Sequence, residues 1–183
     1  MMLVEALIEN GLLQFGQFQI NGVMQPFLIK LDFLASYPDA LKLVRDEFLT
    51  HAPRVPFDRI LCPLDALPLA VAVALELQIP VVYSSKRSEA AVFDLVGAYD
   101  IGYPTLVIAN YADSDLITLI GQAERVGLRL SVVWTVIEIA QVPVPEAQTH
   151  SLLTLHAILD DPFVQSRFAP GQIATVRAWL ARR

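Results

Sequence analysis

The stretch ILCPLDALPLAVAVALELQIPVVYSSK, residues 60–86, decides the fold class of this chain. Two short apolar runs, at 59–62 and 81–84, lie at its ends and show the continuous hydrophobicity typical of strands covered on both faces. The segment 67–78 between them is long and apolar enough to be a helix. A helix joining two buried strands predicts a parallel pair, because parallel strands need a crossover connection.

The same alternation of strand and helix extends beyond this stretch. Apolar runs at 105–109 and 129–138 predict two further strands, and DLITLIGQAERV at 115–126 predicts a helix between them. On the amino side, PDALKLVRDEFL at 38–49 has helical spacing and opens on a proline, which needs no backbone donor there. We therefore expect residues 37–142 to form an α/β core, a parallel sheet flanked by helices.

The amino-terminal segment predicts a small lobe in front of this core. Residues 3–9 have the spacing of a short amphipathic helix. Two aromatic and apolar runs follow, separated by Asn21 and Gly22, a pair that accepts the positive φ of a tight hairpin turn. Residues 1–36 are thus expected to be a hood-like helix and β-hairpin lobe.

The carboxyl-terminal segment, residues 143–183, has mixed signals. VPVPEAQTH at 142–150 has the composition of a linker. SLLTLHAILDD at 151–161 fits either a strand or a helix, and GQIATVRAWLARR at 171–183 predicts a closing helix. At 183 residues, the whole chain, 1–183, is expected to be a single domain.

Composition excludes some classes of function. With 13 Lys and Arg against 19 Asp and Glu, the net charge is −6, so we expect no nucleic-acid partner. Charged residues make up 17% of the chain, against about 25% in ordinary domains, which leaves little polar surface and predicts a homodimer. The longest apolar run, 67–75, is too short to cross a bilayer, so no membrane association is expected.

The cysteine and histidine content indicates a reducing compartment and no metal site. Cys62 is the single cysteine and has no partner for an internal disulfide. The amino terminus has acidic residues before any basic one and lacks the features of a signal peptide, so a cytoplasmic location is expected. His51, His150 and His156 are far apart and form no zinc spacing, so neither a metal nor another cofactor is expected.

In element order and in residues, the chain resembles the type I phosphoribosyltransferases, and the orotate phosphoribosyltransferase family in particular. The stretches that carry this resemblance are 8–44, 60–86, VGAYDIGYPTLVIAN at 96–110 and HSLLTL at 150–155. The resemblance implies the fold of that family, a dimer, and a site for phosphoribosyl pyrophosphate, orotate and Mg²⁺.

The resemblance also locates the ligand loops, where this chain departs from the family pattern. Two adjacent carboxylates that hold the ribose hydroxyls are matched here by Ala109 and Asn110. The Thr/Gly-rich loop for the 5′-phosphate is shorter, and in place of its anion contacts the chain has Asp113, Ser114 and Asp115, after Tyr111. These residues fit equally with a simpler interpretation, in which they cap the helix that follows.

Two further loops have also lost residues that contact the substrate's negative groups in the family. The pyrophosphate loop, which has adjacent glycines in the family, is matched by Asp65 and Ala66, and Asp65 also fits as a cap of the helix at 67–78. None of the chain's 8 glycines lies between Gly22 and Gly97, which argues against a backbone cradle for phosphate there. In the family's catalytic loop, Lys86 is kept and the neighbouring arginine is replaced by serine.

The side that would hold the base has lost its cations. By the resemblance, Asn21 stands for a lysine near the hairpin turn and Ile139 for an arginine that follows a strand. Orotate is an anion, so the change at Ile139 removes the partner for its carboxylate. Phe27 fits either as an apolar face for a flat ring or as a buried core residue.

Three hypotheses about function follow. The first is a protein that keeps the phosphoribosyltransferase scaffold, has lost phosphoribosyl pyrophosphate binding and catalysis, and binds another small molecule or a regulatory partner protein. The second is a divergent active transferase that uses phosphoribosyl pyrophosphate, orotate or another base, and Mg²⁺, with Lys86, Asn110 and Ser114 replacing lost contacts. The third is a structural interaction module without a small-molecule pocket.

Overall fold

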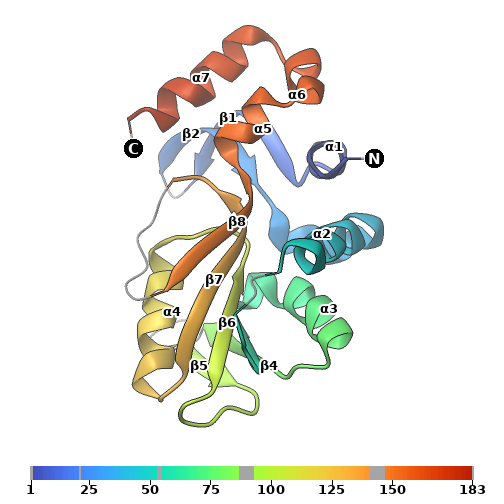
Figure 1. Ribbon diagram of the computed structural model, residues 1–183. Coiled ribbons are helices and arrows are strands. Elements are labelled where there is room, and N and C mark those ends of the chain that lie inside the picture. Colours follow the sequence, from blue (N-terminus) through green and yellow to red (C-terminus); the bar gives the residue numbers. More distant parts are fainter. Residues whose placement is uncertain (1, 21, 53–54, 87–92, 141–146, 183) are drawn as a thin grey trace.

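A computed structural model describes residues 2–20, 22–52, 55–86, 93–140 and 147–182. Within these ranges a six-stranded sheet has the order β5-β4-β3-β6-β7-β8 (Figure 1). Its strands are β3 (Arg59–Cys62), β4 (Val81–Lys86), β5 (Phe93–Val96), β6 (Pro104–Ala109), β7 (Arg129–Glu138) and β8 (Gln148–Thr154). All neighbours pair in parallel except β5, which runs antiparallel to β4. The four strands predicted for the core are confirmed.

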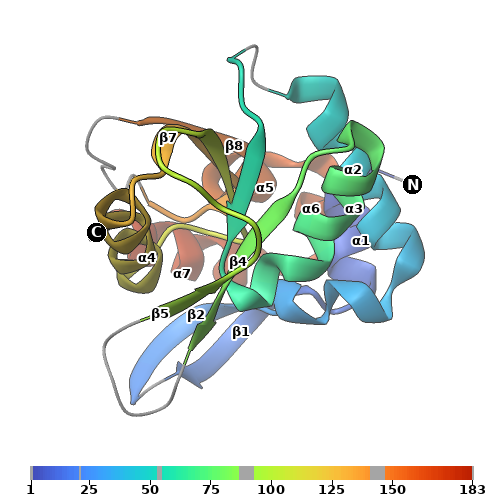
Figure 2. The ribbon, with the colours of Figure 1, turned by 90° about the horizontal axis from the view of Figure 1, so that it is seen from below.

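Helices cover the sheet on both faces, as the continuous apolar strands predicted. α2 (Pro38–His51) and α3 (Leu67–Leu77) lie on one face and α4 (Ser114–Arg125) on the other (Figures 1 and 2). Successive residues of a strand point to opposite faces. Ile60 and Leu106 therefore join the core beneath α2 and α3, while Leu61 and Val107 pack with α4.

The amino-terminal lobe consists of α1 (Leu3–Glu9) and the hairpin of β1 (Leu13–Ile20) and β2 (Val23–Ile29). A short 3-10 helix, η1 (Leu31–Ser36), leads from it to α2. The hairpin turns at Gly22, whose φ of 79° favours glycine, and Asn21 lies outside the described residues. The predicted helix and hairpin are thus present.

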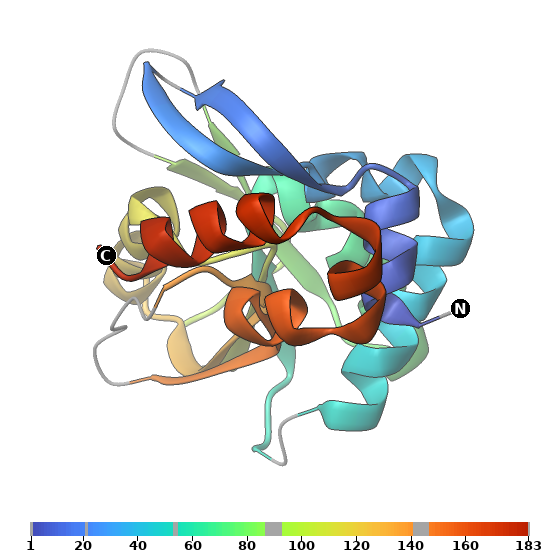
Figure 3. The ribbon, with the colours of Figure 1, turned by 90° about the horizontal axis from the view of Figure 1, so that it is seen from above.

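Three carboxyl-terminal helices complete the structure and pack against this lobe. They are α5 (Leu155–Asp160), α6 (Pro162–Arg167) and α7 (Pro170–Leu180). α7 lies beside the hairpin (Figure 3), where the rings of Phe27 and Trp179 meet edge to face with centroids 5.0 Å apart. Phe15 and Phe168 form a second edge-to-face pair, also at 5.0 Å. The two ends of the chain therefore build the lobe together.

The prediction for the carboxyl-terminal segment needs correction. Residues 148–150, predicted as linker, belong to β8, and the run at 151–161 holds the end of that strand and then α5. β5 and α6 were not predicted. β5 and the start of β8, which were not predicted as strand, lie at edges of the sheet, where one side has no neighbour and the apolar signal is weaker. No helix in the described ranges is both long and apolar enough to cross a membrane.

Candidate functional site

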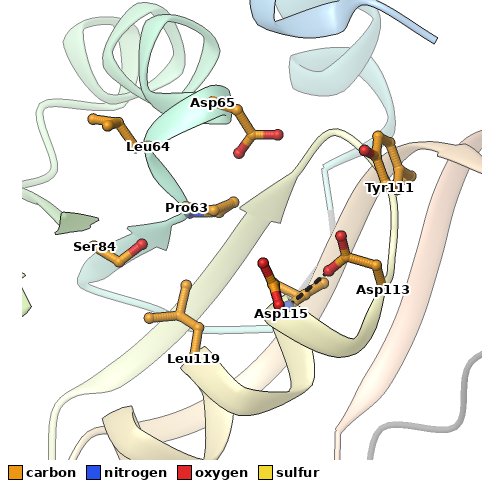
Figure 4. Close-up of a pocket in the computed structure, with 9 residues that line it drawn as sticks. Pro63, Leu64, Asp65, Ser84, Tyr111, Asp113, Asp115 and Leu119 are labelled. Atoms are coloured by element: carbon orange, nitrogen blue, oxygen red, sulfur yellow. Dashed lines mark hydrogen bonds between the residues drawn. The ribbon is translucent and has the colours of Figure 1, made fainter. Parts of the chain in front are cut away.

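A cavity of about 390 Å³ lies at the carboxyl ends of β3, β4 and β6, and we call it the acidic cleft (Figure 4). It is lined by Pro63, Leu64, Asp65, Ser84, Tyr111, Asp113, Asp115, Leu116 and Leu119. Ligands of open α/β sheets commonly bind outside the carboxyl ends of the strands. The carboxyl groups of Asp65, Asp113 and Asp115 surround one space in this view. The cleft thus lies where ligands of such sheets bind, and three carboxylates line it.

Asp113 is the N-cap of α4. Its backbone is extended, and one of its carboxylate oxygens, Oδ1, accepts a hydrogen bond from the Leu116 N–H at 2.8 Å. Ser114 and Asp115 are the next two residues, in the first turn of the helix. The predicted capping by Asp113 is therefore confirmed. A helix N-terminus attracts one anion through its free N–H groups and its dipole, and here the side chain of the protein itself supplies that anion.

Asp65 occupies a different place from the one predicted. It lies in a 3-10 turn, η2 (Leu64–Ala66), so the N-cap of α3 falls on Ala66 and no side chain caps that helix. The second residue of α3 is Pro68, which has no N–H to offer a cap. Instead the carboxylate of Asp65 accepts a hydrogen bond from Asn110. The expectation that Asp65 caps the helix at 67–78 was wrong for this reason.

Asn110 links the ends of two neighbouring strands. Its side-chain N–H group donates to the carbonyl oxygen and to the carboxylate of Asp65, both at 3.2 Å, although 45 residues separate the two. Asn110 is only 2% exposed. Its Oδ1 is buried and has no hydrogen-bond partner among the described residues. An unpaired buried acceptor is costly, so this oxygen leaves capacity for one more donor.

The surroundings raise the pKa of Asp65 and of Tyr111 in the cleft. Burial raises the pKa of the Asp65 carboxyl, opposed by the hydrogen bond from Asn110 and reinforced by the charge of Asp113. Burial also raises the pKa of Tyr111, and the charges of Asp113, Asp65, Asp32 and Asp115 raise it further. The phenol of Tyr111 thus lies in a region of negative potential that several carboxylates create together.

Cys62 is a buried residue and an unsuitable nucleophile. Its side chain is 0% exposed at the end of β3. Burial, with a contribution from the nearby Asp65, raises the pKa of its thiol to about 12. Because the thiolate is the reactive form, a thiol with this pKa is inert near neutral pH. The prediction that Cys62 is a small buried side chain is confirmed.

We expect Asp65→Asn to raise the free energy of unfolding near neutral pH. The pKa of Asp65 is raised in the folded protein, so folding favours its neutral form. The stability contributed by that form is present below the unfolded pKa and is lost as the pH rises through the folded pKa. Asparagine stays neutral and can still accept from Asn110. Because the residue also faces solvent, the gain should stay below about 1 kcal/mol.

Urea unfolding of both proteins at a series of pH values from acid to neutral measures this effect. The wild type should lose stability relative to Asp65→Asn as the pH rises. Asp100→Asn changes an exposed aspartate outside the cleft and is the matched control. A variant at position 65 that is less stable than the wild type at neutral pH would contradict the expectation.

A second cavity of about 380 Å³ lies beneath the hairpin, and we call it the ring cavity. It is lined by Ile20, Gln25, Phe27, Ile29, Tyr111, Ala112, Asp113, Ser114, Ile139, Ala140 and Trp179. These residues come from β1 and β2, from the loop and helix after β6, from the end of β7 and from α7. Phe27 is 2% exposed, which confirms that it is a buried core residue, and it also lines this cavity.

The structure brings together most, but not all, of the predicted site residues. Asp65, Tyr111, Asp113 and Asp115 share the acidic cleft, whereas Ser114 and Phe27 line the ring cavity. Two further residues lie near the cleft without lining it: Ala66 is 1% exposed in η2, and Asn110 is buried behind Asp65. Lys86 ends β4, but its side chain, like Asn21 and the loop at 87–92, lies outside the described residues.

Sequence reasoning missed Ser84, Gln25 and Trp179. Ser84 is a polar residue near the end of a predicted strand, a signal that could have identified it. Trp179 has no local signal, because it reaches the ring cavity only through the packing of α7 on the hairpin. Among the described residues, no group of three or more His, Cys, Asp or Glu side chains is placed to hold a metal ion.

Comparison with solved structures defines the class of this fold. The chain aligns with the UMP synthase of Leishmania donovani with a TM-score of 0.86 and 25% identity, over 99% of this chain and 42% of that one. It aligns with the orotate phosphoribosyltransferase of Aeropyrum pernix with a TM-score of 0.71 and 19% identity, over 87% and 97% of the two chains. The protein has the α/β fold of the type I phosphoribosyltransferases.

Within that class, the likeness is to orotate phosphoribosyltransferases. The orotate phosphoribosyltransferase of Archaeoglobus fulgidus is 28% identical over 112 residues, which are 59% of this chain and 63% of that protein. The matches thus span less than two thirds of this archaeal relative and of the UMP synthase chain. No family model matches the chain. The resemblance inferred from the residues is confirmed.

Proposed function

We propose that this chain is an orotate phosphoribosyltransferase-like protein that does not transfer phosphoribosyl groups and instead binds a small molecule, as a binding or regulatory protein. The observation that carries the proposal is the cap of α4, where Asp113 accepts the Leu116 N–H at 2.8 Å. In the family that the chain resembles, the 5′-phosphate of the substrate lies at a helix N-terminus of this kind. Here a carboxylate takes that place.

The charges of the cleft also argue against binding of a phosphorylated substrate. Two unit charges about 4 Å apart interact by roughly 4 kcal/mol at an effective dielectric constant of 20, before screening by salt. Asp65, Asp113 and Asp115 all line the cleft, and none of the described lining residues is basic. A phosphate or pyrophosphate group would meet repulsion there, with no cation among the described lining residues to offset it. This supports loss of phosphoribosyl pyrophosphate binding.

The likeness to orotate phosphoribosyltransferases favours a second candidate, a divergent active transferase. It would act on phosphoribosyl pyrophosphate and orotate or another base, with Mg²⁺ carried by the substrate, since the described side chains form no cluster able to hold a metal. Lys86, at the end of β4, is its strongest support, because the family keeps a lysine at that position.

Calorimetric titration with phosphoribosyl pyrophosphate and Mg²⁺, combined with an assay of orotate consumption, separates the two candidates. The proposal expects neither binding in the micromolar range nor turnover, with an active orotate phosphoribosyltransferase as the positive control. Asp113→Ser keeps a capping oxygen and removes one charge, so it should bind phosphoribosyl pyrophosphate more tightly than the wild type. Micromolar binding and turnover by the wild type would establish the transferase instead.

We also propose that two copies of this chain associate. Leu64, Val71 and Leu75 are exposed on η2 and α3, Leu75 is 74% exposed, and Leu64 also lines the acidic cleft. Exposed apolar patches on a chain with so few charged residues are typical of interfaces. Sedimentation velocity of the full chain should give the mass of a dimer, and a single species at monomer mass would contradict it.

The lone buried thiol of Cys62 suits the reducing cytoplasm, where we propose the protein works.

A further inference from the structure

The acidic cleft and the ring cavity share a wall. Tyr111 and Asp113 line both of them, and they lie in the loop between β6 and α4. Each cavity, at about 390 and 380 Å³, is within the range of small-molecule sites. The two cavities are therefore adjacent at Tyr111 and Asp113.

The ring cavity favours a flat and uncharged group. Phe27, Ile29, Ile139 and Trp179 give it apolar walls, and the Phe27 and Trp179 rings hold each other edge to face. Gln25 and Ser114 add groups that can both donate and accept. None of the described lining residues is basic, so a carboxylate on the ring would be left unpaired.

The acidic cleft favours groups that donate hydrogen bonds. The carboxylates of Asp65, Asp113 and Asp115, which line it, are hydrogen-bond acceptors. Hydroxyl and ammonium groups supply donors, whereas a phosphate supplies further acceptors and negative charge. The shared wall thus divides an apolar compartment from one that is rich in acceptors and poor in donors.

We propose, on the basis of the proposed function, that the two cavities bind one ligand in two parts. A flat, uncharged ring lies in the ring cavity, and an arm with hydroxyl or ammonium groups lies in the acidic cleft, without phosphate. Nucleosides and aromatic amines share this chemistry. The ligand class therefore differs from the phosphorylated and anionic substrates of the proteins that the chain resembles.

Titration of the full chain with the four common ribonucleosides, tyramine and tryptamine tests this proposal, with the matching nucleoside 5′-monophosphates and orotate as comparisons. At least one nucleoside or amine should bind, and its identity distinguishes the two sources. A nucleoside that binds should do so at least about 10-fold more tightly than its monophosphate, and uracil more tightly than orotate. Absence of binding by the whole panel, or equal binding of nucleoside and monophosphate, would overturn the proposal.

Variants locate the effect at the shared wall. Asp113→Ser should narrow the preference for nucleoside over monophosphate by about 10-fold, because one carboxylate is removed while a capping oxygen remains. Asp161→Ser is the matched control, since Asp161 caps α6 by accepting the Phe163 N–H at 2.8 Å, the same distance as in the Asp113 cap, and lines neither cavity. Ile139→Arg should bring a gain in orotate binding at the ring cavity.

Failure of this proposal and failure of the proposed function give different results. If the panel does not bind and phosphoribosyl pyrophosphate is neither bound nor converted, only the ligand class is wrong. If phosphoribosyl pyrophosphate and orotate are converted, the proposed function itself is wrong, whatever the nucleosides do. If Asp113→Ser and Asp161→Ser change the preference equally, the wall between the cavities is not its source and the proposal fails.

Discussion

Phe48→Ala is expected to lower the free energy of unfolding by about 3–5 kcal/mol, the usual range for a buried aromatic residue. Phe48 is 0% exposed on α2, and its ring meets that of Trp134 on β7 edge to face, with centroids 4.5 Å apart and planes at 88°. The substitution removes this pair and leaves a cavity between helix and sheet. Urea unfolding followed by tryptophan fluorescence measures the loss.

Phe33→Ala is the matched control for this variant. Phe33 is 54% exposed, so its removal should change the free energy of unfolding by no more than about 0.5 kcal/mol. A loss at Phe48 as small as that at Phe33 would show that α2 does not pack on β7 through this ring pair.

Gly97→Ala is expected to cost about 2–4 kcal/mol through strain and steric overlap. The φ of Gly97 is 134°, a conformation that residues with a side chain rarely adopt. A Cβ at this position would lie 2.6 Å from the carbonyl oxygen of Val81 on β4, which cannot move without shifting the strand. The β4–β5 pair also carries Ser84, a lining residue of the acidic cleft, so ligand binding should weaken as well.

Gly121→Ala is the opposite case and completes the experiment. Gly121 lies inside α4, and nothing within 4 Å of an added Cβ would obstruct it. Alanine favours helix over glycine by up to about 1 kcal/mol, so this variant should be more stable than the wild type. Thermal unfolding of the two variants side by side should shift the midpoint in opposite directions, and a stable Gly97→Ala protein would contradict the backbone described at Gly97, directly after β5.

The central part of the fold could be predicted because its strands are apolar on both faces. In β7, for example, Val132 and Trp134 pack toward α2 and α3 while Val133 packs toward α4, and the buried Thr135 is a single polar position within the run from Val132 to Ile137. The start of β8 was not predicted because its first residues, Gln148 to His150, are exposed at the edge of the sheet and have the composition of a linker. Local patterns carry little information about such edge strands.

The candidate site was predictable only where one segment contains the signal. Asp113 follows a strand and precedes an amphipathic helix, and both its place in the loop and its cap could be inferred. The bond between Asn110 and Asp65 spans 45 residues and arises only when β3 and β6 pair. The cap of α3 was wrongly assigned to Asp65 because a 3-10 turn precedes this helix. That turn moves the N-cap position by one residue, from Asp65 to Ala66.

The link between Asn110 and Asp65 restricts the order in which this loop could change. An Asn110→Asp replacement alone would set two carboxylates about as far apart as the present hydrogen bond, 3.2 Å, with the new one buried and that of Asp65 facing solvent, so the two like charges would repel. One of the two carboxyl groups would then keep its proton near neutral pH, and replacing Asp65 as well would remove that constraint. An acidic side chain at position 110 is therefore accommodated at lower cost in a chain without the carboxylate at position 65.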